Sequence, residues 1–251
     1  MIDTHAHLNL EDFDQDRLKV ISSCQEAGIK VINAGIDYQS SVRAISLAQE
    51  KGFYASVGVH PNSPSEDPDK LSDLIDQPGV VAIGETGLDF YRQPDDATEK
   101  HRQRELFLSQ GQLARRAGLP LIIHCRRAYP ELMLLLRREL KGVPGVIHSF
   151  SGSLTEAREL LHLGYYLGFN GLVFKQDLEE VIISTPLERI LIETDSPFLA
   201  PPSINQSRNV PYLGLRPVVE KIAFIKKVST VEIIDLADKN AYHLFQLDKH
   251  E

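Results

Sequence analysis

The feature that most constrains the fold of this chain is a regular alternation of short apolar, β-rich runs with stretches of helical periodicity. About eight of these runs have the length of strands and the spacing of βα units. The strands are predicted at Met1–His5, Ile29–Ala34, Tyr54–Val59, Val80–Glu85, Leu119–His124, Val143–His148, Tyr165–Phe169 and Arg189–Glu193. Because strands joined through helices pair in parallel, the alternation predicts an α/β protein built on a parallel sheet.

Helical patterns lie between the predicted strands and often end at a glycine. They cover Asp14–Ala27, Tyr38–Glu50, Thr98–Ala117 and Tyr129–Leu140. The glycines that stand where a left-handed residue would end a helix are Gly28, Gly52, Gly118 and Gly164. After the eighth strand, Pro197–Pro217 is rich in proline and is expected to be a loop. Two helices, Val218–Lys227 and Val231–Leu247, are expected to close the barrel.

Eight such units favour a closed (β/α)₈ barrel, the TIM barrel fold, formed as a single domain over residues 1–251. An open doubly wound sheet is the alternative. It is disfavoured because no G-x-G-x-x-G turn follows the first predicted strand, and because candidate reactive residues stand at the ends of many strands.

The formal net charge of −8 argues against a broad basic surface of the kind that holds duplex DNA. A cleft that meets phosphates with a few arginines and bound metal ions is compatible with this charge. No signal-peptide pattern or membrane-length apolar stretch is present, so a cytoplasmic protein without a membrane partner is expected, and nothing points to an obligate protein partner. Cys24 and Cys125 form no C-x-x-C motif and are expected to be buried free thiols.

Two segments at strand ends carry candidate metal ligands. Within Asp3–His7, residues two apart in an extended chain point to the same side, so the imidazoles of His5 and His7 can reach one ion. Within Gly84–Asp89, Glu85 is expected to end the fourth strand inside the barrel mouth, where its two oxygens can bridge two ions. A helix cap is the structural alternative for Glu85.

Three further candidates follow the fifth, sixth and eighth predicted strands. His124 and His148 are each the first polar residue after a β-rich run. One such histidine is more often a hydrogen-bonded core residue than a ligand, but two on consecutive units favour ligands. Asp195 lies two residues beyond Glu193 on the same face, so one of the two can bind an ion while the other orients a ligand. A turn opener is the alternative for Asp195.

The joint placement of these residues favours one metal site. Barrel enzymes build their active sites at the C-terminal ends of several strands, and strands one, four, five, six and eight here each end in a His, Glu or Asp. The candidate metal ligands are His5, His7, Glu85, His124, His148 and Asp195. A binuclear site explains six such groups at one rim better than six independent accidents do.

Five motifs, H-x-H, G-E-x-G-L-D, P-x-x-I-H-x-R, H-x-F-S-G and E-T-D-S-P, occur in this order and together resemble the TatD family of metal-dependent hydrolases over almost the whole chain. The resemblance implies a deoxyribonuclease, often a 3′ to 5′ exonuclease on single strands, that uses two divalent ions. It assigns one ion to His5, His7, Glu85 and Asp195, and the other to Glu85, His124 and His148. The chain departs from the family pattern between Pro202 and Ser207, which bears on substrate preference more than on chemistry.

Two ions can acidify a water and stabilise attacking and leaving oxygens, which suits phosphodiester hydrolysis. Glu85 and Asp195 are then the catalytic residues, with Asp195 accepting or relaying the proton of the water. The predicted substrate-binding residues are Arg126 and Arg208, for phosphate oxygens, and His60. Solvated arginines and a structural histidine are the alternatives, and Asp89 is expected to order this rim or Arg126.

An imidazole-rich site prefers Zn²⁺, Mn²⁺, Ni²⁺ or Co²⁺ on ligand grounds, whereas the family resemblance implies Mg²⁺ or Mn²⁺ in use. Single-stranded DNA is the expected substrate. Two other functions stay open: hydrolysis of a different ester, such as an aminoacyl ester on tRNA, and binding of metal or nucleic acid without catalysis. Comparing the turnover of esters and phosphodiesters separates these alternatives.

Overall fold

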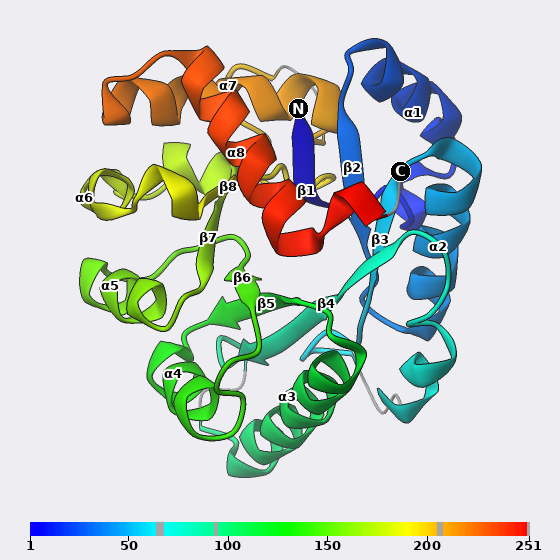
Figure 1. Cartoon of the computed structure of the whole chain (residues 1–251), viewed down its shortest axis with the longest axis vertical. Coiled ribbons are helices and arrows are strands. Elements are labelled where there is room, and N and C mark those ends of the chain that lie inside the picture. The colour runs from blue at the N-terminus through cyan, green and yellow to red at the C-terminus, as the bar shows by residue number, and fades with distance from the viewer. Residues whose placement is uncertain (64–67, 93–94, 205–207, 250–251) are drawn as a thin grey trace.

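Eight parallel strands form one sheet whose spatial order is the same as their order along the chain (Figure 1). The computed structural model describes residues 1–63, 68–92, 95–204 and 208–249. The strands are β1 (Ile2–Ala6), β2 (Lys30–Ala34), β3 (Tyr54–Val57), β4 (Val80–Asp89), β5 (Leu121–Arg126), β6 (Gly145–Ile147), β7 (Tyr166–Phe169) and β8 (Ile190–Ile192). The predicted TIM barrel architecture is confirmed.

The sheet curls so that the segment after β8 runs beside β1. The Asp195 N–H donates to the His5 carbonyl at 2.9 Å, and the His7 N–H donates to the Ser196 carbonyl at 2.7 Å. Ala6 and Ser196 also form a parallel β-bridge. These bonds join the segment after β8 to the end of β1, and they place Asp195 beside His5 and His7.

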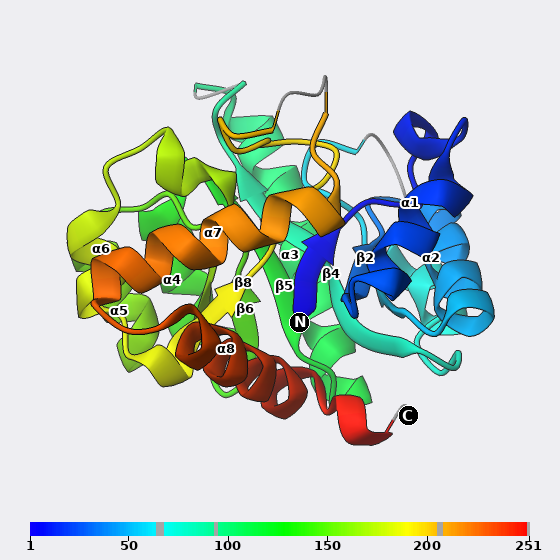
Figure 2. The same cartoon turned by 90° about the horizontal axis from the view of Figure 1, so that it is seen from above.

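A layer of apolar side chains fills the barrel near the N-terminal ends of its strands. Every strand contributes to this layer, whose members are Ile2, Ile32, Tyr54, Val81, Ala82, Ile122, Val146, Tyr166 and Leu191. Helix α8 (Thr230–Phe245) packs Ala241, Leu244 and Phe245 against it. In Figures 1 and 2 this helix crosses the end of the barrel at which the N-terminus lies. Access to the barrel is therefore left at the opposite end, where parallel strands present their C-terminal residues.

The other helices surround the barrel. They are α1 (Arg17–Glu26), α2 (Tyr38–Lys51), α3 (Ala97–Ala117), α4 (Tyr129–Arg138), α5 (Leu154–His162), α6 (Glu179–Ser184) and α7 (Pro211–Lys226). The four glycines that were expected at helix ends all have positive φ, as the left-handed conformation requires. Both cysteines are buried free thiols, as predicted. Among the helices of the described residues, none is long and apolar enough to span a membrane.

The prediction that Pro197–Pro217 is a loop is wrong for its last part, because α7 begins at Pro211 and contains Pro217. Pro211 fits the first position of a helix, where the backbone N–H has no helical partner to lose. Pro217 lacks one helical hydrogen bond, but Leu215 and Val218 are buried on this helix and packing outweighs the local preference. Residues 205–207 of the predicted loop lie outside the described residues.

Strand β4 also differs from its prediction, because it continues through Glu85 to Asp89 rather than ending at Glu85. Gly84 and Gly87 permit the extension with φ values of 149° and 140°. A Cβ on Gly87 would lie 2.0 Å from the His124 carbonyl oxygen, so only glycine allows β4 to approach β5 this closely. The close pairing holds Glu85 inside the barrel mouth, next to His124.

Candidate active site

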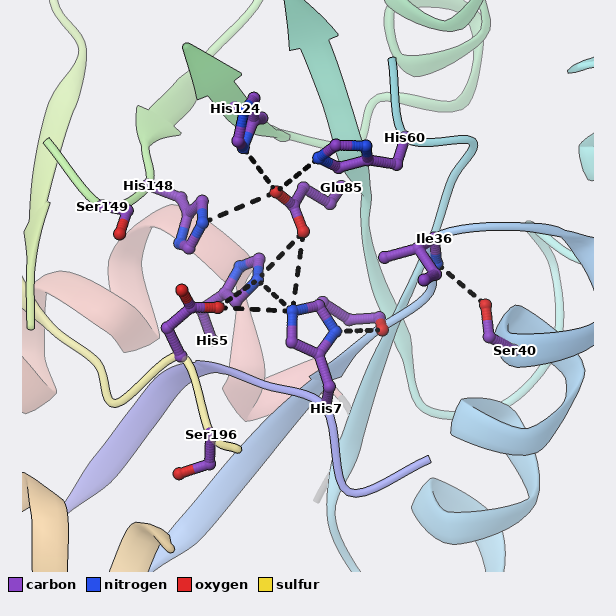
Figure 3. Close-up of polar contacts among 12 residues, drawn as sticks. His5, His7, Ile36, Ser40, His60, Glu85, His124, His148, Ser149 and Ser196 are labelled. Atoms are coloured by element: carbon purple, nitrogen blue, oxygen red, sulfur yellow. Dashed lines mark hydrogen bonds and ion pairs between the residues drawn. The ribbon is translucent and has the colours of Figure 1, made fainter. Parts of the chain in front are cut away.

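Glu85 lies at the centre of a cluster of imidazoles at the C-terminal mouth of the barrel (Figure 3). Its two carboxylate oxygens face different histidines. Oε2 lies 3.3 Å from His5 Nε2 and 3.6 Å from His7 Nε2. Oε1 lies 2.8 Å from His124 Nδ1 and 3.5 Å from His148 Nε2. One carboxylate therefore stands between two groups of nitrogen atoms.

Asp195 faces the same side of the cluster as His5 and His7. Its Oδ1 lies 3.4 Å from His7 Nε2 and 3.8 Å from His5 Nε2. Its φ of 55° is a left-handed value that residues other than glycine seldom adopt and that often marks functional sites. The structure thus brings all six predicted metal ligands together, and their role as ligands stays a prediction.

Burial and mutual charge control the protonation of this cluster. Burial alone would raise the pKa of Glu85, but the surrounding imidazoles hold that pKa well below its usual range. Burial also opposes ionisation of Asp195, and neighbouring histidines nevertheless lower its pKa. For His148 the two effects act in the opposite directions. Burial would lower the pKa of its imidazole, but Glu193 and Glu85 raise that pKa to about 10. The cluster therefore favours anionic carboxylates beside protonated imidazole. A bound cation can displace protons from the imidazoles and supply the positive charge in their place.

Glu193 fixes the orientation of His148. The buried Glu193 Oε1 accepts from His148 Nδ1 at 3.0 Å, from the Ser149 N–H at 2.7 Å and from Asn170 Nδ2 at 3.1 Å. Because Glu193 holds the hydrogen on Nδ1, Nε2 is the nitrogen that faces the cluster, and it can bind an ion once its own proton is displaced. The geometry agrees with the expected division between Glu193 and Asp195, in which one carboxylate joins the cluster and the other orients a ligand.

Backbone groups position His5 and His7. His7 Nδ1 lies 3.1 Å from the Ala34 carbonyl oxygen, so this nitrogen donates there and Nε2 faces the cluster. The buried Asp3 accepts from the N–H of His5 at 3.2 Å and from the N–H of Thr194 at 3.0 Å. Burial raises the pKa of Asp3 to about 7 in spite of these hydrogen bonds. Sequence reasoning assigned no role to Asp3, because its contact with Thr194 crosses the barrel closure and no local pattern reveals it.

His124 lies between two carboxylates. Its Nδ1 is 2.8 Å from Glu85 Oε1, and its Nε2 is 3.3 Å from Asp89 Oδ2. Asn62 Nδ2 donates to the same Asp89 oxygen at 2.8 Å. Burial opposes ionisation of Asp89, but these hydrogen bonds hold its pKa well below the usual range. Asp89 therefore orders this rim, and it does so through His124 and Asn62.

His60 joins the cluster with a different hydrogen-bonding pattern. Its Nδ1 accepts the backbone N–H of Asn62 at 3.1 Å, so the neutral ring carries its hydrogen on Nε2. That Nε2 lies 3.4 Å from Glu85 Oε1. Burial lowers the pKa of His60, which favours the neutral ring. His60 thus presents a hydrogen-bond donor at the mouth, which suits contact with a substrate better than it suits metal ligation.

The two predicted phosphate-binding arginines have different surroundings. The Arg126 guanidinium carbon stacks 3.7 Å from the ring centre of Tyr91, and the side chain lines a cavity at the mouth. Arg208 places its guanidinium carbon 4.3 Å from the ring centre of Phe13 and pairs with Asp16. It lines neither of the two cavities that contain the cluster. Phosphate binding stays a prediction for both, and the geometry favours Arg126.

The donor atoms of the cluster fit divalent cations. Three overlapping groups have ligand atoms within 4.8 Å of one another: His5 with His148 and Asp195, His5 with His7 and Glu85, and His60 with Glu85 and His124. The Nε2 atoms of His5 and His7 converge to 3.1 Å, so two nitrogen atoms and a Glu85 oxygen point at one place. Imidazole and carboxylate together suit zinc, manganese, nickel and cobalt.

Comparison with known proteins identifies similar chains over nearly the full length. The family model described as TatD related DNase matches residues 2–246. The chain is 37% identical over 258 residues to a Bacillus subtilis protein named uncharacterized metal-dependent hydrolase YabD, covering 99% of this chain and 100% of the relative. It is 32% identical over 262 residues to the 3'-5' ssDNA/RNA exonuclease TatD of Salmonella typhimurium, covering 98% of this chain and 99% of the relative.

A solved structure shows the same similarity in three dimensions. The crystal structure of YjjV, a TatD homolog from Escherichia coli, superposes with a TM-score of 0.89 at 31% sequence identity. The superposition covers 98% of each chain. The barrel and the elements that carry the clustered side chains therefore have a full-length counterpart.

Proposed function

This chain belongs to the TatD-related DNase family of metal-dependent hydrolases, and from that membership we propose that it cleaves phosphodiester bonds in single-stranded nucleic acid. The proposed activity is that of a deoxyribonuclease acting as a 3′ to 5′ exonuclease. The similarity to the 3'-5' ssDNA/RNA exonuclease of Salmonella typhimurium supports this activity. The observation that carries the proposal is the division of the two Glu85 oxygens between two groups of imidazoles, because each oxygen would help to hold one of two ions together with the imidazoles that face it.

Two divalent ions belong to this proposal. The proposed ligands of one ion are His5, His7, Glu85 and Asp195, and those of the other are Glu85, His124 and His148. When bound, such a pair supplies an activated water and stabilises the charge that develops on the phosphate. Mg²⁺ or Mn²⁺ is the proposed ion in use, and Zn²⁺, Ni²⁺ and Co²⁺ also fit the ligand types.

The surrounding side chains have separate proposed roles. Asp195 is anionic because its pKa is lowered, and its carboxylate is placed in the cluster to accept a proton from the attacking water. His60 offers Nε2–H to a phosphate oxygen. Arg126 offers a planar fork of N–H donors to a second phosphate oxygen at the rim. The net charge of −8 supports single strands over duplex, since it argues against a broad basic surface of the kind that holds duplex DNA.

The test is a screen of metal-stripped protein reloaded with one type of ion at a time. End-labelled single-stranded and blunt duplex oligonucleotides are the substrates, with an aminoacyl ester as a third. We expect stepwise shortening of single strands from the 3′ end with Mg²⁺ or Mn²⁺, and loss of both ion and cleavage in a His5→Ala, His7→Ala double variant. Ester turnover without phosphodiester cleavage, or faster cutting inside blunt duplex, would overturn the proposal.

A further inference from the structure

Two cavities open at the mouth of the barrel and meet at the cluster. The larger has a volume of about 410 Å³ and contains most of the proposed metal ligands. The smaller has a volume of about 270 Å³ and extends beside the short helix η3 (Gly171–Phe174). The residues that line both are His124, His148, Ser149, Asp195 and Phe198. A substrate held at the cluster can therefore reach into both cavities, and the chemistry proposed above assigns the smaller one no role beyond the phosphate contact of Arg126 at its wall.

The ring of Phe198 stands at the boundary between the two cavities and is 50% exposed. Its backbone is nevertheless held in place. The Phe198 N–H donates to the Asp195 carbonyl at 2.7 Å. The next residue, Leu199, packs so closely on Gly171 that a Cβ on Gly171 would lie 1.8 Å from the Leu199 carbonyl oxygen. The ring meets His7 edge to face, with the ring centres 6.0 Å apart, and its exposed part offers an aromatic surface for stacking at the site.

The remaining walls of the smaller cavity combine apolar and polar groups. The apolar ones are Cys125, Leu172 and Leu199, and the polar ones include Arg126, Ser151 and Gln176. The volume of about 270 Å³ is below the about 300 Å³ at which pockets for drug-sized ligands begin, so it suits one ring system rather than several nucleotides. A nucleobase has the matching chemistry, with apolar faces that stack and a polar edge that forms hydrogen bonds.

We propose that the smaller cavity is the subsite for the terminal nucleobase of the substrate, and that Phe198 stacks on this base. The inference rests on the proposed nuclease function, and it adds where the nucleotide that cleavage releases is bound. With the scissile phosphate at the cluster, the terminal base occupies the smaller cavity, and the rest of the strand leaves through the larger one past Arg92. Recognition of a strand end by stacking is in keeping with a chain of net charge −8, because stacking needs no basic surface.

The first test compares single-stranded oligonucleotides that end in a normal 3′ nucleotide or in an abasic one. We expect the unaltered protein to cleave the base-bearing end with a kcat/KM about tenfold higher or more, the factor that stacking on an aromatic ring supplies. Phe198→Ala should remove this preference and Phe198→Tyr should keep it. Phe224→Ala is the matched control, because Phe224 is 79% exposed on α7 and lines neither cavity. A preference that survives in Phe198→Ala overturns the proposal.

The second test needs no turnover. Calorimetry compares the binding of a nucleoside 5′-monophosphate with that of ribose 5-phosphate, which lacks the base. We expect tighter binding of the nucleotide, and loss of the difference in Phe198→Ala and in Leu172→Trp, whose larger side chain fills the cavity. Equal binding of the two ligands by the unaltered protein overturns the subsite. If oligonucleotides are not cleaved but the binding difference is present, the nuclease proposal fails and the nucleobase subsite stands.

Discussion

Glu193 accepts the Nδ1–H of His148 over 3.0 Å and thereby directs His148 Nε2 at Glu85. Loss of a group that orients a metal-binding histidine typically lowers metal affinity by roughly 10- to 100-fold. We therefore expect Glu193→Gln to weaken metal binding by about that factor while circular dichroism shows an intact fold. Glu188→Gln, at an exposed position just before β8, is the control. Equal affinities of the two variants in metal titrations would contradict the orienting role.

Metal loading is expected to release protons. In the metal-free chain burial disfavours a charged His148, but Glu193 and Glu85 raise its pKa to about 10, so the ring is protonated at neutral pH. An ion that binds Nε2 must displace this proton, and about one proton or more per chain should appear in an unbuffered titration with MnCl₂ near neutral pH. Apparent affinity should accordingly rise as the pH is raised. Binding without proton release would mean that His148 is neutral in the free protein.

Asp195→Asn tests the proton acceptor. Asparagine has nearly the same shape and still offers an oxygen, but it cannot take a proton from water. We expect the variant to fold, to keep the ion proposed for Glu85, His124 and His148, and to bind oligonucleotide. Its turnover should fall by a factor on the order of 10² to 10⁴. Circular dichroism, metal content and single-turnover rates are measured on one preparation, and a metal-loaded variant that cleaves at the parent rate removes Asp195 from the mechanism.

Alanine variants of His60 and His124 should both lose turnover but should differ in metal content. His60 Nδ1 accepts a backbone N–H, so its Nε2 carries a hydrogen and is a donor. His60→Ala should keep both ions and lose turnover by a factor on the order of 10², as the removal of one stabilising donor does. His124→Ala should lose an ion as well as turnover. If His60→Ala also binds fewer ions, His60 is a ligand and its assignment as a substrate contact is wrong.

Arg126 and Arg208 should differ in their effect on substrate binding. Arg126→Ala is expected to raise the KM for single-stranded oligonucleotide and to weaken its dependence on salt, because one phosphate contact is lost. Arg208 already pairs with Asp16, so Arg208→Ala should change the salt dependence less. KM values measured over a series of salt concentrations decide between them. A larger effect at Arg208 would mean that its pairing opens when substrate binds.

The sequence by itself determined the fold class and the side chains that gather at the barrel mouth. Both follow from local periodicity, which assigns a face to each residue of a strand. The spacing of His5 and His7 is enough to place them on one side of β1, and their Nε2 atoms lie 3.1 Å apart. The spacing of Glu193 and Asp195 similarly indicated that one would join the cluster and one would support it. Residues at the ends of parallel strands then meet because a barrel collects those ends at one rim.

Only the tertiary structure decided which atoms face one another. The bond from His148 to Glu193 joins residues 45 apart, and the bond from Thr194 to Asp3 joins residues 191 apart. Local periodicity predicts the face of the strand on which a side chain lies. It does not predict the hydrogen-bond partner of that side chain, because the partner is distant in sequence and meets it only when the barrel closes. The partner in turn sets which nitrogen of an imidazole carries the hydrogen. Packing likewise explains why α7 begins at Pro211, since the burial of a whole helix face outweighs the local preference of a proline-rich segment.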